Sequence, residues 1–120
     1  MLFRSIYACE IQHKNSDTFK DIFSFNEGDD LNFYTGSFLD DDFNSHMKNV
    51  WGTEKFDIIV MNSPYQTASS GSHNRSRPLY NVFIEKAIDI SNVVLSIHPS
   101  RWMGKSIGLD KFRKIGRAHV

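Results

Sequence analysis

The sequence contains little cysteine, few prolines and no long apolar run. Cys9 is the single cysteine among 120 residues, which excludes an internal disulfide framework and fits a reducing compartment. No apolar segment approaches the length of a membrane span, and Met1–Arg4 does not open a signal peptide, so we expect no membrane partner. No spacing of cysteine and histidine suggests zinc. Ten phenylalanines and 40% hydrophobic residues suffice for the core of one small domain, or part of one, and argue against disorder.

Charge sums to zero but is unevenly distributed along the chain. Residues 1–60 contain 5 Lys/Arg and 11 Asp/Glu, a net charge of −6. Residues 61–120 contain 9 Lys/Arg and 3 Asp/Glu, a net charge of +6. A polyanion can therefore bind the second half, and a dipolar surface without such a partner is the alternative.

The pattern of elements predicts an α/β protein in which strands and helices alternate. Strands are expected at 5–11, 31–35, 56–61 and 93–97, and helices at 13–25, 42–50, 79–90 and from residue 110 onward.

The stretch from Lys55 to Gln66 organises the rest. Ile58–Met61 is a short apolar run with β-branched residues, which predicts a buried strand. The run stops at Asn62-Ser63-Pro64-Tyr65, where Pro64 cannot continue a central strand. This tetrapeptide is therefore expected in a loop at the carboxyl end of a strand, the edge where open α/β sheets bind ligands.

The tetrapeptide has groups suited to an exocyclic amine. The Asn62 side-chain oxygen and the Ser63 carbonyl can accept its hydrogen bonds, and Tyr65 can stack on the ring that carries it. An amine that attacks a methyl donor becomes more tetrahedral, so acceptors placed for that geometry favour the transition state. A strand-ending turn with a surface tyrosine is the alternative.

Strand followed by Asn62-Ser63-Pro64-Tyr65 resembles motif IV of the amino-methyltransferases, usually Asn-Pro-Pro-Tyr. The resemblance implies that all four residues are catalytic. Ser63 stands where the family has its first proline. The contact attributed to that position is a backbone carbonyl, which serine also provides.

Two earlier segments resemble cofactor motifs of the same family. Glu10 ends the first strand, where an acidic residue can accept hydrogen bonds from ribose hydroxyls, and a solvated strand end is the alternative. In motif II this acid holds the ribose of S-adenosylmethionine, and Ile11 would pack on its adenine. Gly36-Ser37-Phe38-Leu39-Asp40 resembles motif III, in which Phe38 would pack on the adenine. Ser37 replaces the family's aspartate and keeps a hydrogen-bonding hydroxyl without the charge.

The acidic triplet Asp40-Asp41-Asp42 is most simply a solvated loop and helix start, with Asp40 or Asp41 as the N-cap. Metal binding by the triplet is the alternative, and the resemblance implies no metal.

The downstream half contains the basic residues and further family motifs. The loop 66–78 is polar, and its Arg75 and Arg77 can contact a phosphate backbone. A flexible connection is the alternative. Ile97-His98-Pro99-Ser100-Arg101-Trp102 and Gly108-Leu109-Asp110-Lys111-Phe112-Arg113 resemble restriction–modification adenine methylases in order and spacing. The resemblance extends the nucleic-acid-binding set to Arg101 and Lys105.

The resemblance implies a partial Rossmann-like fold of S-adenosylmethionine-dependent methyltransferases. No glycine-rich motif I precedes Ser5, so the first strand is expected to be missing. Residues 1–114 are predicted to be a catalytic-domain fragment covering motifs II to VI. Residues 115–120 do not continue the helical pattern of Phe112 and match a translated sequencing adapter, so we predict a non-native tail.

The implied function is part of a bacterial or phage-like, cytoplasmic, N6-adenine-specific DNA methyltransferase of a restriction–modification system. Its partners would be S-adenosylmethionine, double-stranded DNA with a flipped adenine, and a separate or fused restriction endonuclease. A protein-glutamine or RNA methyltransferase is the second hypothesis. A non-catalytic α/β module that binds nucleic acid is the third.

Overall fold

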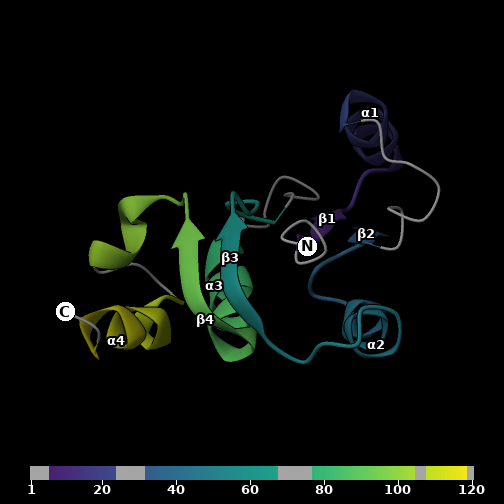
Figure 1. Ribbon diagram of the computed structural model, residues 1–120. Coiled ribbons are helices and arrows are strands. Elements are labelled where there is room, and N and C mark those ends of the chain that lie inside the picture. The colour runs from purple at the N-terminus through teal and green to yellow at the C-terminus, as the bar shows by residue number, and fades with distance from the viewer. Residues whose placement is uncertain (1–5, 24–31, 68–76, 105–107, 119–120) are drawn as a thin grey trace. The chain divides into compact units, whose positions relative to one another are not determined.

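The structure is a computed structural model that describes residues 6–23, 32–67, 77–104 and 108–118. The chain divides into two units, Met1–Glu54 and Lys55–Val120. In the described residues, each unit contains a two-stranded parallel sheet and the helices that follow its strands (Figure 1). The mixed α/β class predicted from the sequence is confirmed at this level.

The first unit begins as a parallel strand–helix–strand crossover. Strand β1 (Ala8–Glu10) pairs with β2 (Phe33–Thr35), and helix α1 (His13–Phe23) connects them. Ser16 is buried and accepts a hydrogen bond from the Thr35 hydroxyl at 3.1 Å. The Phe19 ring packs on Phe33 at 5.3 Å. These contacts hold α1 against the sheet, whereas Ile22 on the same helix is exposed.

An aromatic cluster forms the core of the first unit beside α2 (Asp41–Asn49). Phe43 is 2% exposed, and its ring contacts those of Tyr34, Phe38 and Trp51 at 5.0–5.8 Å. Asp40 occupies the N-cap position of α2, one of the two predicted caps, but makes no side-chain capping hydrogen bond.

Gly36 lies against this cluster, and we expect Gly36→Ala to destabilise the fold. A Cβ atom there would lie 2.7 Å from Tyr34 Cε1, and the Tyr34 ring is itself packed against Phe43 and His46. Overpacking of this kind costs about 1–3 kcal/mol in the free energy of unfolding. Chemical denaturation measures the loss.

Gly104→Ala is the matched control, since its Cβ would approach nothing closer than the Arg101 carbonyl oxygen, at 3.8 Å. Equal stability of the two variants would contradict the packing described for Gly36.

The second unit has the same strand–helix–strand order. Strand β3 (Phe56–Met61) pairs in parallel with β4 (Ser91–Ser96), and helix α3 (Tyr80–Ile90) lies on one face of the pair (Figure 1). A single 3-10 turn (Ser100–Met103) and helix α4 (Asp110–Ala118) follow. The core consists of Tyr80, Ile84, Leu109 and Phe112, with Met61 and Trp102 packed against it.

The prediction that β3 and β4 are buried is wrong for one of their faces. Val60 is 75% exposed and Leu95 57% exposed, and these residues are paired across the strands. Ile58 and its partner Val93 are also exposed, whereas Ile59 and Met61 are half-buried. Side chains alternate between the two faces of a strand. The exposure therefore follows because, among the described residues of this unit, helices cover the face opposite Val60 and Leu95.

Several element boundaries also differ from the prediction. Within the described part of the predicted range 5–11, the first strand covers Ala8–Glu10, and residue 5 lies outside the described residues. Strand β4 begins at Ser91, directly after α3. Helix α4 continues to Ala118, although residues 115–120 were not expected to continue the helical pattern of Phe112. Residues 115–118 belong to the helix but add no regular apolar spacing, so apolar periodicity did not predict them as helical. The non-native origin of 115–120 stays a prediction.

Candidate active site

The loops after β3 and β4 meet at one edge of the second unit. Met61 and Ser96, the last residues of the two strands, are partners in the parallel register. The Ile97 N–H donates to the Met61 carbonyl at 3.1 Å, which extends the pairing past the strand ends. The tetrapeptide that starts at Asn62 therefore lies at the carboxyl edge, as the sequence predicted, and the segment that contains Arg101 follows the neighbouring strand.

Within the tetrapeptide, exposure differs from residue to residue. Asn62 is exposed, and its side chain has no hydrogen-bond partner among the described residues. Ser63 is 6% exposed, and its hydroxyl is buried without a hydrogen-bond partner in the part of the chain that the structure describes. Tyr65 is 45% exposed. The arrangement anchors the tetrapeptide at Ser63 and leaves an amide and an aromatic ring accessible to a ligand.

Backbone pairing that the sequence did not predict holds the position of Tyr65. The Leu79 N–H donates to the Tyr65 carbonyl at 3.1 Å, and Gln66 and Pro78 form an antiparallel bridge. Thr67 and Arg77 exchange two further bonds, from the Thr67 N–H to the Arg77 carbonyl and from the Arg77 N–H to Thr67 Oγ1. Arg77 is exposed, and its backbone lies opposite that of Thr67.

The predicted nucleic-acid-binding residues fall into two groups. Arg77 and Arg101 are exposed at the carboxyl edge of the second unit. Arg75 and Lys105 lie outside the described residues.

Tyr80, which is buried, and His98, which is half-buried, pack against each other near this edge. Their rings stack at 5.5 Å with 19° between the planes, and Phe112 packs edge-on to both. Burial raises the pKa of Tyr80, while the positive charge of Arg101 opposes that rise. The positive charge of Arg101 therefore acts on the Tyr80 phenol and lowers its pKa. The sequence marked His98 only as part of a family motif, because stacking partners distant in sequence give no local pattern.

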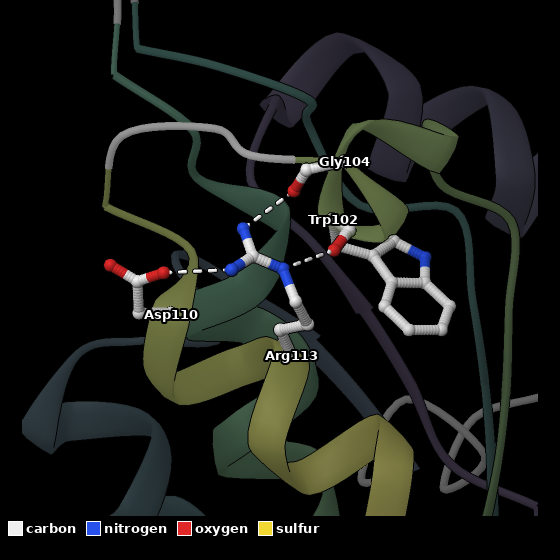
Figure 2. Close-up of polar contacts among 4 residues, drawn as sticks. All are labelled: Trp102, Gly104, Asp110 and Arg113. Atoms are coloured by element: carbon white, nitrogen blue, oxygen red, sulfur yellow. Dashed lines mark hydrogen bonds and ion pairs between the residues drawn. The ribbon is translucent and has the colours of Figure 1, made fainter.

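Arg113 is a second residue whose contacts the sequence did not predict. Its guanidinium donates to the Trp102 carbonyl at 3.0 Å, to the Gly104 carbonyl at 2.5 Å and to Asp110 Oδ1 at 2.8 Å (Figure 2). The side chain is 15% exposed. Arg113 thus connects the first turn of α4 to the backbone that follows β4.

The four predicted cofactor residues lie at the carboxyl edge of the first unit. Glu10 ends β1 opposite Thr35, which ends β2, and the Gly36 N–H donates to the Glu10 carbonyl at 2.9 Å. Glu10 Oε1 accepts from the Gln12 N–H at 2.9 Å. Ile11 follows Glu10 and is exposed, an uncovered apolar side chain next to a carboxylate.

Ser37 and Phe38 follow the neighbouring strand of the same edge. Ser37 Oγ accepts from the Leu39 N–H at 3.2 Å, so the hydroxyl stabilises its own turn and keeps its proton available to another acceptor. Phe38 is half-buried against Phe43. The parallel register therefore brings Glu10, Ile11, Ser37 and Phe38 together.

The surroundings of Tyr34 raise the pKa of its phenol. Burial raises the pKa of Tyr34, and the negative charges of Asp42 and Asp40 raise it further. In the described ranges, no group of three or more His, Cys, Asp or Glu side chains could hold a metal ion.

Comparison with known proteins identifies the family. The family model of the Eco57I restriction-modification methylases matches residues 4–117. The chain belongs to this family. It is also similar to an uncharacterized adenine-specific methylase of Mycoplasma pneumoniae (strain ATCC 29342 / M129 / Subtype 1), with 38% identity over 66 residues. That match covers 52% of this chain and 16% of the relative, so the matched stretch spans a small part of that protein. No solved structure gives a significant match.

Membership of the Eco57I methylase family confirms the resemblance predicted from the sequence motifs. The matched range contains both carboxyl edges, with Glu10, Ser37 and the tetrapeptide that begins at Asn62. The roles of these residues remain predictions. No helix in the described part of the chain has the length and apolar character required to cross a membrane.

Proposed function

We propose that this chain is part of the catalytic domain of a DNA methyltransferase that transfers a methyl group from S-adenosylmethionine to adenine N6. The observation that supports this best is the tetrapeptide at the carboxyl edge of β3. There Ser63 is buried, while Asn62 and Tyr65 are exposed beside the segment that follows β4. Membership of a restriction-modification methylase family supports the same reaction.

In this proposal Asn62 and Ser63 act on the target amine. The Asn62 side-chain oxygen and the Ser63 carbonyl accept hydrogen bonds from the two N–H groups. Two acceptors outside the plane of the base favour a tetrahedral nitrogen, whose lone pair is then available for attack. Because the acceptors fit the transition state better than the planar ground state, they lower the barrier. Pro64 limits the backbone conformations around these acceptors.

Tyr65 would hold the base after it leaves the duplex. Extruding a base costs a few kcal/mol, and stacking on an aromatic ring returns about 1–3 kcal/mol. The exposure of Tyr65 leaves its ring accessible, and the bond from the Leu79 N–H fixes its backbone.

Basic residues at the same edge would contact the DNA backbone. Arg77 and Arg101 are exposed there, and Arg75 and Lys105 complete the set predicted from the sequence. Phosphate contacts fix the register of a protein on a duplex without reading the base sequence.

The residues of the first unit fit the adenosine half of S-adenosylmethionine. Glu10 has carboxylate acceptors for ribose hydroxyls, and Ile11 and Phe38 offer apolar surface at the same strand ends. Ser37 has a proton to donate, although it cannot supply the charge of an aspartate. When bound, the cofactor supplies an electrophilic methyl group, and the residues named here would orient its adenosine.

Both sheets support the proposal that the fold is part of a larger, Rossmann-like sheet. A parallel sheet is normally covered on both faces, and isolated two-stranded sheets are rarely stable in water. Exposed apolar pairs such as Ile58–Val93 and Val60–Leu95 are unusual in parallel sheets, whose two faces are normally both covered. Further strands and helices of the natural protein would bury this face.

Substrate competition tests the proposed function against its closest alternatives. The full-length natural protein that contains this sequence is incubated with labelled S-adenosylmethionine and an equal mixture of duplex DNA, RNA and protein. We expect the label in DNA. Label in RNA or in glutamine side chains would support the second hypothesis from the sequence, and binding of DNA without any transfer would support the non-catalytic module.

Replacing Ser63 distinguishes a backbone contact from a side-chain contact. Because the proposed acceptor is the carbonyl, Ser63→Ala is expected to keep the methylation rate within about threefold, a change below 1 kcal/mol. The variant also removes a buried hydroxyl that has no partner among the described residues, so stability is expected to stay equal or to rise. Steady-state kinetics and thermal melting measure the two effects. A hundredfold loss of rate in a folded Ser63→Ala protein would show that the hydroxyl itself acts.

A further inference from the structure

Arg113 makes polar contacts through all three nitrogens of its guanidinium. Three of its nitrogens are engaged with three different residues, two of which contribute backbone carbonyls (Figure 2). A guanidinium has five donors in a rigid planar arrangement, so contacts in several directions fix both its position and that of its acceptors.

These contacts determine the backbone that follows Arg101. The Gly104 N–H donates to the Arg101 carbonyl at 3.3 Å and closes the 3-10 turn. The Gly104 and Trp102 carbonyls in turn accept from Arg113. A short chain of hydrogen bonds therefore connects Arg113 to the peptide groups on the carboxyl side of Arg101.

Packing below the turn strengthens this connection. Leu109 and Phe112, on either side of Asp110, belong to the core that also contacts Trp102. Lys111 pairs with Glu85 at 3.2 Å, which connects α4 to α3 at the surface. Arg113 thus projects from a helix start whose own position is determined by the core, and not from a loose end.

We propose that Arg113 is a positioning residue for the DNA contact of Arg101. The inference rests on the proposed function, because it assigns Arg101 to a phosphate of the bound duplex. Arg113 does not contact the DNA. It holds the 101–104 backbone so that the Arg101 guanidinium reaches the phosphate at the edge where Asn62 and Tyr65 receive the base.

Salt dependence of DNA binding provides a readout that ordinary destabilisation would not change. Each phosphate contact that is lost reduces the slope of log K against log salt by about 0.9 for duplex DNA. In the full-length natural protein with S-adenosylmethionine present, Arg101→Ala is expected to lower the slope by about 0.9, the value for one phosphate contact. Arg113→Lys is expected to lower it similarly, although it keeps the positive charge, because a flexible ammonium lacks the rigid planar fork that fixes both carbonyls and Asp110 at once.

Lys114→Met is the matched control on the same helix. Lys114 is exposed next to Arg113, so its replacement removes a charge without touching the turn. We expect its slope and affinity to equal those of the wild-type protein. The double variant Arg101→Ala/Arg113→Lys should bind DNA as Arg101→Ala does, because two residues that act through one contact are not additive.

The outcomes separate this inference from the function on which it rests. Absence of salt-dependent DNA binding in the wild-type protein would remove the proposed function. Binding by the wild-type protein, with an unchanged slope in Arg113→Lys or additive losses in the double variant, would overturn only the role of Arg113.

If Arg113→Lys melts below the assay temperature, Asp110→Asn serves as the second variant. It removes the negative charge that pairs with the guanidinium at 2.8 Å and leaves only a neutral amide acceptor, so a smaller fall in slope is expected, and an unchanged slope would overturn the role of Arg113.

Discussion

Replacing Asn62 by alanine is expected to lower the rate of methyl transfer by roughly 100- to 1000-fold, the range measured when one oriented group that stabilises a transition state is removed. Asn62 is exposed, so its replacement removes little buried surface and the expected loss follows from the missing acceptor. The proposed acceptor acts on the amine, whereas the proposed cofactor residues follow other strands. The Kd for S-adenosylmethionine should therefore stay within about threefold, less than 1 kcal/mol.

The control for this result is Asn92→Ala. Asn92 is also an exposed asparagine, but it lies near the amino end of β4, at the opposite end of the strand from the tetrapeptide. Single-turnover kinetics with labelled S-adenosylmethionine measure the chemical step, and calorimetry measures cofactor binding. An Asn62→Ala protein that methylates at the rate of Asn92→Ala would exclude the assigned role.

Replacing Phe43 by alanine is expected to cost about 3–5 kcal/mol in the free energy of unfolding, the usual range for removing a buried phenylalanine. Phe43 is 2% exposed and is in contact with three other aromatic rings. One of those rings is that of Phe38, part of the predicted adenine surface. A folded Phe43→Ala protein should therefore also bind S-adenosylmethionine more weakly, because Phe38 loses the neighbour that fixes its rotamer.

Val50→Ala is the control for this core substitution. Val50 caps the same helix but is exposed, so its replacement should change stability by less than about 0.5 kcal/mol. Denaturant unfolding followed at a single probe compares the two variants, with cofactor titration at low denaturant. Similar midpoints for Phe43→Ala and Val50→Ala would contradict the core assigned to the first unit.

The sequence predicted the order of the elements well because apolar periodicity and turn residues are local signals. The parallel pairing of β1 with β2 and of β3 with β4 agrees with the strand–helix–strand pattern. Burial was harder to predict. Ile58 and Val60 look like residues of a fully buried strand, and their exposure depends on what packs against the face, which no local pattern records.

The candidate site was predictable to a similar extent. A strand that stops at Asn62 predicts a loop at the carboxyl edge, and the structure places the loop there. The pairing of Tyr65 with Leu79 joins residues separated by a long polar loop, and the contacts of Arg113 with Trp102 and Gly104 connect a helix to a turn. Such contacts depend on the tertiary fold, so they became visible only in the structure.

The identity of the methylated nucleoside tests the central claim most directly. The full-length natural protein is incubated with duplex DNA and labelled S-adenosylmethionine, and the DNA is then digested to nucleosides and separated by mass. The proposed roles of Asn62, Ser63 and Tyr65 predict label in N6-methyladenine, and its loss when Asn62 is replaced by alanine. Label in a methylated cytosine, or N6-methyladenine that persists undiminished in Asn62→Ala, would contradict the account.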